Sequence, residues 1–330
     1  MGVLLSELGR KLAERWLSLL VLPGAFFLAV ATAARILGHR HALDVRTLTA
    51  QVSTWITSPA ATSTYGQAIL LAAVIAGSAG VGLAAQALGS AVERVVLAAG
   101  WRTWPWPARL LAARHVTRRR AAWDAAHARY HQLYQQAARA RATGTRQDPA
   151  ERHAAHHRRT RIALERPDRP TWSGDRIHAV TVRLDRDLNL DLTTVWPYLW
   201  LTLPDTTRTE ITTADQAVSR ATTLTAWALL YLPLAYLWWP AAPAAAVLAV
   251  TARRRVRAAT DTHARLIEAA TRLHITDLAD RLRIQHVGAP TAALGATITH
   301  HLQSSPPPPA PAPRAEARPP APRPLDVEVD

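Results

Sequence analysis

Four histidines in the chain have the spacing of metal ligands on helices. His127 and His131 are four residues apart, as are His153 and His157, so each pair shares one face of a helix. If the chain turns near residue 145, the two pairs are offset along the helices by roughly 9 to 15 Å. Neighbouring arginines would also repel a cation. We therefore interpret the four histidines as parts of solvated helix faces, and we predict no metal and no other cofactor.

Three aspartates form an acidic cluster that could coordinate Mg²⁺ or act as general acid and base. A structural role is the alternative. Asp191 can cap a following helix, while Asp185 and Asp187 can pair with Arg183 and Arg186. We favour the structural role, so the sequence leans away from an enzyme and indicates no catalytic residue.

Two motifs combine aromatic, glycine, proline and charged residues. In Pro-Thr-Trp-Ser-Gly-Asp-Arg, a loop leads into a helical pattern whose start could receive a phosphate, but Ser173 and Asp175 also suit helix capping. In Trp-Pro-Tyr-Leu-Trp, the two tryptophans are four residues apart and point the same way, into a core or a membrane surface. We interpret both motifs as structural. The candidate residues in and beside these motifs are Pro170, Thr171, Trp172, Gly174, Asp175, Arg176, Asp191, Trp196, Pro197, Trp200 and Pro204.

Composition excludes several classes of chemistry. The chain has no cysteine, which excludes disulfides, thiolate zinc sites and a cysteine nucleophile. It has no Walker loop and no GxGxxG, GxSxG or HExxH motif. Most of its net charge of +15 lies within residues 94–220, and the run of arginines there lies close to a span, so anionic lipid is a better partner than nucleic acid. The arginines expected to face lipid are Arg114, Arg118, Arg119, Arg120, Arg253, Arg254, Arg255 and Arg257.

Three apolar stretches are long enough to matter for a membrane. A bilayer core about 30 Å thick needs about 20 helical residues. Two stretches each provide one uncharged span, and residues 221–252 provide a third stretch, with Trp-Trp-Pro in its middle. Proline ends helices and tryptophan prefers the headgroup level, which predicts a helical hairpin there. The predicted spans are residues 16–34, 65–92, 221–239 and 240–256.

Lysine and arginine are denser before the first span, after the second and after the fourth. Such residues favour the cytoplasmic side, so we expect both termini inside a bacterial plasma membrane. A cleaved signal peptide ending near residues 31–33 is an alternative for the N-terminus. The remaining segments are a cytoplasmic N-terminus (1–15), an extracytoplasmic loop (35–64), a basic helical cytoplasmic domain (93–220), cytoplasmic C-terminal helices (257–303) and a disordered Pro-rich tail (304–330).

The basic domain has helical patterns of its own. Apolar residues recur at helical spacing over 108–141 and stop at Thr143-Gly144, and a second helix over 148–165 would pack against the first as a projecting hairpin. Long helices continue without a break into the third span and out of the fourth. The predicted fold is thus all-α: a four-span helical membrane protein whose helical cytoplasmic domain is built on extended transmembrane helices.

These motifs also carry a resemblance. PTWSGDR (170–176), DLTTVWPYLWLTLP (191–204), the Trp-Trp-Pro hairpin and LGHRHALDV (37–45) resemble a family of uncharacterised multi-pass integral membrane proteins from high-GC actinobacteria, in the pattern PTWxGDR followed by DLxxxWPxLWLxLP. The resemblance covers most of residues 1–285. It implies a membrane fold and no particular activity.

Three classes of function remain. A membrane-anchored interaction or scaffold module comes first, because the distinctive residues are cytoplasmic and the Pro-rich tail offers a docking peptide for a protein partner. A channel or transporter component comes second; it would need to be a homo-oligomer, because the spans have no ionisable lining. A membrane-bound enzyme comes third.

Overall fold

The computed structural model describes residues 21–57, 62–145 and 148–303, and this part of the chain contains helices and no strand. The all-α fold is therefore confirmed. The predicted N-terminal segment 1–15, the first residues of the 16–34 span and the tail 304–330 lie outside the described residues. The elements are α2 (Leu22–Leu37), α3 (Val45–Ile56), α5 (Thr64–Leu97), the 3-10 helix η2 (Trp101–Thr103), α6 (Trp106–Ala142), α7 (Ala150–Ile162), α8 (Trp172–Leu188), α9 (Leu192–Thr202), α10 (Asp205–Leu237), α11 (Ala241–Arg281) and α12 (Ala292–Leu302).

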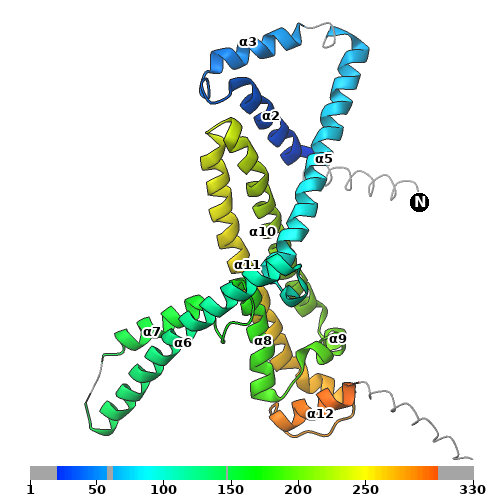
Figure 1. The fold of residues 1–330 in the computed structure, drawn as a ribbon. Helices are drawn as coiled ribbons and strands as arrows, with labels where there is room; N and C mark the ends of the chain where they lie inside the picture. The colour runs from blue at the N-terminus through cyan, green and yellow to red at the C-terminus, as the bar shows by residue number, and fades with distance from the viewer. Residues whose placement is uncertain (1–20, 58–61, 146–147, 304–330) are drawn as a thin grey trace, which may run out of the picture.

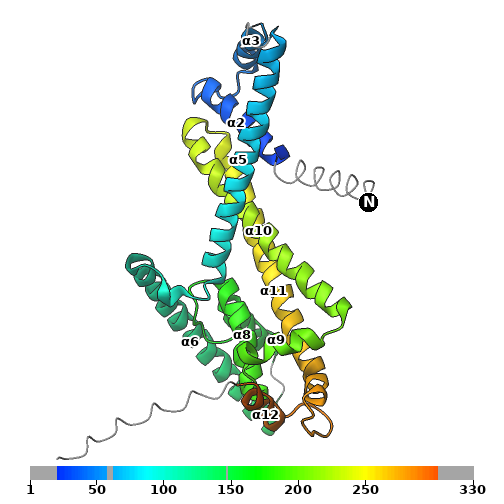
Figure 2. The same cartoon turned by 90° about the vertical axis from the view of Figure 1, so that its right-hand side faces the viewer.

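Three long helices organise the molecule. Figures 1 and 2 show α5, α10 and α11 along its length, with α2 and α3 beside one end and α8, α9 and α12 at the other. The α10–α11 turn lies at the same end as α2 and α3. The part in which α8, α9 and α12 pack against α10 and α11 is called the body, and the α6–α7 hairpin is called the arm.

Helix α5 is long and apolar enough to cross a membrane. Its 34 residues reach a mean hydropathy of 2.2 over an 18-residue window, of which only 17% is buried. Side chains such as Ile69, Leu70 and Leu71 are exposed. A helix that forms the core of a soluble protein would bury such residues. Among the described helices α5 alone meets this criterion, while α2 is apolar but shorter.

The predicted hairpin turn at Trp238-Trp239-Pro240 is confirmed. Helix α10 ends at Leu237 and α11 begins at Ala241, and the two helices pack side by side (Figure 1). The turn also contacts the loop that follows α2. His39 Nδ1 donates to the Leu237 carbonyl at 2.8 Å, and Trp238 Nε1 donates to the Ala42 carbonyl at 2.9 Å. The two loops therefore lie at the same end of the helix group.

Small residues let the apolar helices approach closely. A Cβ atom added at Gly24 of α2 would lie 2.0 Å from the Ser78 carbonyl oxygen of α5. A Cβ atom at Gly89 would lie 3.0 Å from the Thr223 Cα atom of α10. The backbones of α2, α5 and α10 are thus in near contact, as is typical of helices that pack through small residues. Gly80 differs, because nothing lies within 4 Å of an added Cβ there.

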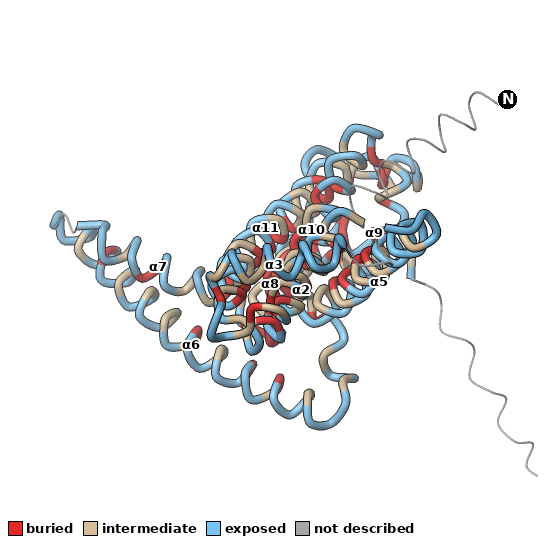
Figure 3. Tube along the Cα trace, turned by 90° about the horizontal axis from the view of Figure 1, so that it is seen from above, coloured by how far each residue is buried: buried red, intermediate tan, exposed pale blue. Residues whose placement is uncertain are grey.

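The body has a hydrophobic core of its own. Leu184, Leu199, Ile275 and Ile298 are fully buried and come from α8, α9, α11 and α12. Asp191 caps α9 as predicted, since its carboxylate accepts from the Thr193 amide at 3.0 Å. Figure 3 shows buried positions concentrated where the long helices and the body overlap in view.

The two tryptophans of the Trp-Pro-Tyr-Leu-Trp motif point the same way, as predicted. Their ring centroids are 5.8 Å apart, and Trp196 and Trp200 both pack, half-buried, against the body core. Pro197 lies inside α9 and is exposed, and Pro204 precedes α10. This motif therefore packs α9 against the core that the other helices of the body provide.

The arm projects sideways from the rest of the molecule (Figures 1 and 3). Helix α6 ends one residue before Thr143-Gly144, and α7 folds back along it. Trp123 Nε1 donates to the Ala163 carbonyl at 3.0 Å and fixes the register of the two helices. The predicted antiparallel hairpin is confirmed.

One helix was not anticipated. Residues 35–64 are expected only as a loop, yet Asp44 accepts from the Arg46 and Thr47 amides and starts α3. This helix is short, so its apolar pattern is weak against the stronger signals of the long helices. Helix α12 lies in the segment 257–303, where C-terminal helices are expected; Thr291 starts it, and its Gly295 approaches the Leu188 carbonyl of α8.

Candidate functional site: a basic junction below the apolar helices

A stretch of irregular chain between α7 and α8, residues 163–171, lies at the centre of the molecule and is called the connector. Side chains from earlier elements donate to its carbonyls. Trp101 Nε1 donates to Asp168 at 3.0 Å, and Arg120 Nε donates to Pro167 at 2.7 Å. His115 Nδ1 donates to the Pro170 carbonyl at 2.8 Å. Because irregular backbone needs partners for its polar groups, these side chains hold the connector in place.

A buried ion pair lies under the connector. Arg119 of α6 is 2.6 Å from the Asp175 carboxylate, and these side chains are only 13% and 4% exposed. Asp175 also accepts from the backbone amides of Asp168 and Arg169 at 2.9 and 2.7 Å. Burial raises the pKa of Asp175, while the two amides and Arg119 act against this rise. The carboxylate thus joins α6, the connector and α8.

The next residue of the motif ties α8 to α11. Arg176 Nε lies 2.6 Å from Asp261, and the Arg176 side chain is 4% exposed. Asp261 also pairs with Arg265, one turn further along α11. A guanidinium buried at this depth requires a carboxylate, and Asp261 provides it from a position 85 residues away in the chain.

The start of α8 is packed against the end of α5. The Thr171 hydroxyl donates to the Val96 carbonyl and accepts from the Gly174 amide. A Cβ atom at Gly174 would lie 2.4 Å from the Leu97 carbonyl oxygen. The Pro-Thr-Trp-Ser-Gly-Asp-Arg motif therefore forms a joint between helices, with glycine where two backbones meet.

The acidic residues near the end of α8 are spread over different partners. Asp187 pairs with Arg186, as expected, and with Arg272 of α11 at 2.7 Å. The expected pairing of Asp185 is not seen. Arg183 and Arg186 instead bind Glu165 of the connector. These contacts join elements, and they do not assemble a site for a cation.

The arm histidines are arranged differently from two facing pairs. Arg159 Nη1 lies 3.4 Å from His127 Nδ1, and the His127 ring stacks on Trp123 with centroids 4.4 Å apart. His131 lies beside His127, while His156 of α7 faces Tyr130. The part of the chain that the structure describes holds no group of three residues suited to a metal ion.

A cavity of about 650 Å³ opens beside the start of α8 and is called the basic pocket. Its cationic lining comes from three helices, and Trp172 and His115 are part of its wall. The Arg257 guanidinium lies over the Trp172 ring, 4.8 Å from its centroid. Sequence reasoning grouped most of these arginines as a general surface and missed Arg161. The lining arginines are Arg118 and Arg119 of α6, Arg161 of α7, and Arg253 and Arg257 of α11.

The expectation that Arg119 and Arg120 face lipid is corrected. Arg119 turns inward to Asp175, and Arg120 donates to the connector and pairs with Asp168 at 2.5 Å. Their neighbours Arg114 and Arg118 are exposed. Successive residues of a helix point in different directions, so one run of arginines divides between the interior and the surface.

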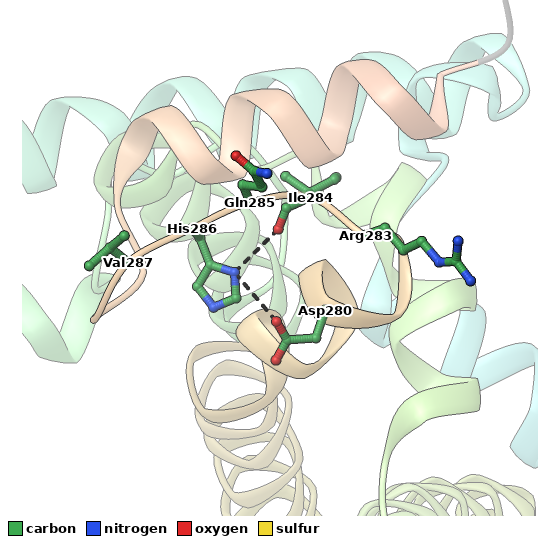
Figure 4. A pocket seen from close by; sticks show the side chains of 6 residues that line it. All are labelled: Asp280, Arg283, Ile284, Gln285, His286 and Val287. Carbon is green, nitrogen blue, oxygen red and sulfur yellow. Dashed lines mark hydrogen bonds and ion pairs between the residues drawn. The ribbon is translucent and has the colours of Figure 1, made fainter.

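Two other cavities are weaker candidates for a binding site. Figure 4 shows one beyond the end of α11, where His286 lies 3.7 Å from Asp280 and Val287 is 97% exposed. His286 Nδ1 also lies 3.4 Å from the Ile284 carbonyl. This cavity of about 690 Å³ is an open surface around a turn. The other, of about 560 Å³, lies between α5 and α10 and includes Gln86 and Thr223.

The described residues thus form an all-helical protein with a membrane-length apolar helix, and its arginines gather around the connector and the basic pocket. The chain matches no family model, no curated protein and no solved structure.

Proposed function

We propose that this protein is a membrane-anchored interaction or scaffold module with four spans and both termini in the cytoplasm of a bacterial cell. The four apolar segments are α2 with the residues before it, the first part of α5, the last part of α10 and the first part of α11. The observation that carries the anchor is α5, whose apolar window is only 17% buried. Exposed apolar side chains of this number are stable in lipid and costly in water.

The packing of the other apolar segments supports four spans. Phe27 of α2 packs edge-on against Tyr231 of α10, with centroids 5.3 Å apart, and the α2 loop is bonded to the α10–α11 turn. Both loops therefore belong on one side of a bilayer, and the arginine-rich arm belongs, together with the body, on the other.

An interaction role is favoured over catalysis by what the charged residues do. Asp175, Arg176, Asp187 and Asp191 each hold helices together or cap them. The arm is left as a polar hairpin that projects from the molecule (Figure 3), with Tyr134 on its surface at 53% exposure. Tyrosine is enriched at the residues that contribute most to protein–protein binding, so Tyr134 on the projecting arm supports an interaction role.

Site-specific photocrosslinking in native membranes tests this role. A photoreactive residue replaces Tyr134 on the arm, and a matched control replaces Leu273, which is 71% exposed on α11. We expect one discrete adduct, identified by mass spectrometry, from the arm position only. The absence of an adduct at Tyr134, or the same set of adducts from both positions, would contradict an interaction role for the arm.

An oligomeric channel component is the second candidate. It is favoured by the cavity between α5 and α10, whose wall includes Gln86, Ser90 and Thr223. The lining also includes Arg220 and Arg255, so the cavity lies at the cytoplasmic end of the proposed spans, where polar side chains can line a pathway. The purified protein in planar bilayers should conduct ions if this candidate is right, and a Gln86→Leu variant should conduct less.

A further inference from the structure

The charges of the basic pocket are not balanced by the protein. Arg119 is neutralised by Asp175, but the other four lining arginines have no carboxylate within salt-bridge distance in the described part of the chain. Arg257 has only the Trp172 ring beneath it. The four are Arg118, Arg161, Arg253 and Arg257.

This grouping is electrostatically unfavourable when the pocket is empty. Burial, and then the positive charges of Arg253, Arg119 and Arg161, lower the pKa of Arg257. Like charges held near one another from separate helices raise the free energy of the fold, and an anion would relieve that repulsion. The packing of α6, α7 and α11 therefore holds these positive charges together in the basic pocket. The repulsion raises the free energy of the fold, and a bound anion would lower it again.

Guanidinium groups match the geometry of a phosphate. Each presents donors in a planar fork, which can bind two oxygens of one phosphate, and it keeps its charge at any physiological pH. The pocket has room for a headgroup, at about 650 Å³. Arg253 also lies in the last turn of the segment 240–256 proposed as the fourth span, where it would reach the headgroup level.

We propose that the basic pocket binds the phosphate group of an anionic phospholipid headgroup, held by Arg118, Arg161, Arg253 and Arg257. The lipid as source of the phosphate rests on the proposed membrane function, whereas the phosphate chemistry rests on the pocket alone. Because the arginines come from α6, α7 and α11, the bound headgroup would also tie the arm to the helix that leaves the membrane.

The test uses the full chain purified in detergent. Native mass spectrometry measures the Kd of the first phosphatidylglycerol bound, with phosphatidylcholine as the neutral lipid, and a separate arm adds inorganic phosphate as competitor. Arg161→Gln and Arg253→Gln are the pocket variants. Arg158→Gln and Arg281→Gln are matched controls, because they remove the same charge from the same helices at exposed positions outside the pocket.

We expect phosphatidylglycerol to bind the parent more tightly than phosphatidylcholine. Each pocket variant should raise this Kd about tenfold, as is typical for loss of a charged hydrogen bond, and each control less than about twofold. Melting temperatures without added lipid show that the variants are folded. The proposal would be overturned if the pocket and control variants raised the Kd for phosphatidylglycerol equally. It would also be overturned if the two lipids bound with equal affinity and inorganic phosphate did not bind.

Two results separate the sources of phosphate and the two proposals. If inorganic phosphate displaces the lipid and binds as tightly, the phosphate chemistry stands and the lipid source is wrong. Because the measurement is made in micelles, it does not depend on the number of spans. A topology experiment that contradicts four spans while the arginine effects persist would therefore refute the proposed anchor and leave the pocket intact.

Discussion

At the scale of single residues, a buried carboxylate is stable only when donors surround it. Asp175 has Arg119 on one side and the amides of the connector on the other. Removal of one partner of such a pair leaves an uncompensated buried charge, which costs more than the pair itself contributes. Two amides of the connector also donate to Asp175, so its loss would leave them without this acceptor.

Asp175→Ala should therefore lower the free energy of unfolding by about 3 to 5 kcal/mol. Asp185→Ala is the control, since Asp185 is exposed and such changes stay within about 0.5 kcal/mol. Thermal melts of the purified protein in detergent measure both. The double variant with Arg119→Ala should cost less than the sum of the single changes; strict additivity would show that the ion pair is not formed.

A second residue links stability to pH. Burial, and next the positive charge of His131, lower the pKa of His127, so the folded arm binds a proton less readily than the unfolded arm. The stabilising contribution is present above the ordinary histidine pKa of about 6.5 and is lost as pH falls through the lowered pKa. Protonation at Nδ1 would also remove the acceptor for Arg159.

We expect amides of α7 to exchange hydrogen faster at pH 5.5 than at pH 7.5, after correction for intrinsic rates. His127→Gln keeps an acceptor without a titrating group, so the difference should shrink. His156 remains and titrates in the same direction, because burial lowers its pKa too. An unchanged difference in the variant would assign the effect to His156 or to other groups.

At the scale of elements, close packing of the apolar helices depends on small residues at particular positions. The α2–α5 contact has Gly24 against the Ser78 backbone, and Gly80, also on α5, faces open space. Van der Waals contact is what holds such helices together in lipid. An added methyl group should therefore weaken the packing of α2 on α5 at Gly24 and have no such effect at Gly80.

Gly24→Ala should separate α2 from α5 and lower the melting temperature in detergent. Gly80→Ala should leave it unchanged or raise it slightly, because alanine favours a helix over glycine by about 1 kcal/mol. Circular dichroism at the helix signal follows both variants. A drop of equal size in the two would place the effect in the α5 backbone and contradict the proposed contact.

The elements themselves follow from local pattern more readily than the joint does. The α10–α11 turn could be predicted because Pro240 and the adjacent tryptophans interrupt a long uncharged run, and the end of α6 because Gly144 follows it. The partners of Arg119 and Arg176 could not. Asp175 and Asp261 are distant in sequence from the arginines they bind, and no local pattern encodes a pairing that only tertiary packing creates.

At the scale of the whole molecule, the proposed topology places α3 outside and the arm and α12 inside. The chain has no cysteine, so single cysteines can report on each. Thr49, Ala138 and Ala296 are exposed positions on α3, α6 and α12. Reagent added to intact cells should label only Thr49→Cys, and all three should react after the membrane is permeabilised. Labelling of Ala138→Cys from outside would reverse the orientation.

The body core is built from both sides of the α10–α11 turn: Leu184 and Leu199 precede this turn in the chain, and Ile275 and Ile298 follow it. During synthesis, therefore, α8 and α9 emerge before the helix that covers them exists. Their apolar faces therefore stay uncovered until α10 and α11 have both been synthesised and α11 packs against them. In the proposed topology, the cytoplasmic part can fold only after the hairpin is inserted, so quality control that recognises exposed apolar surface would detect a failed insertion on the cytoplasmic side.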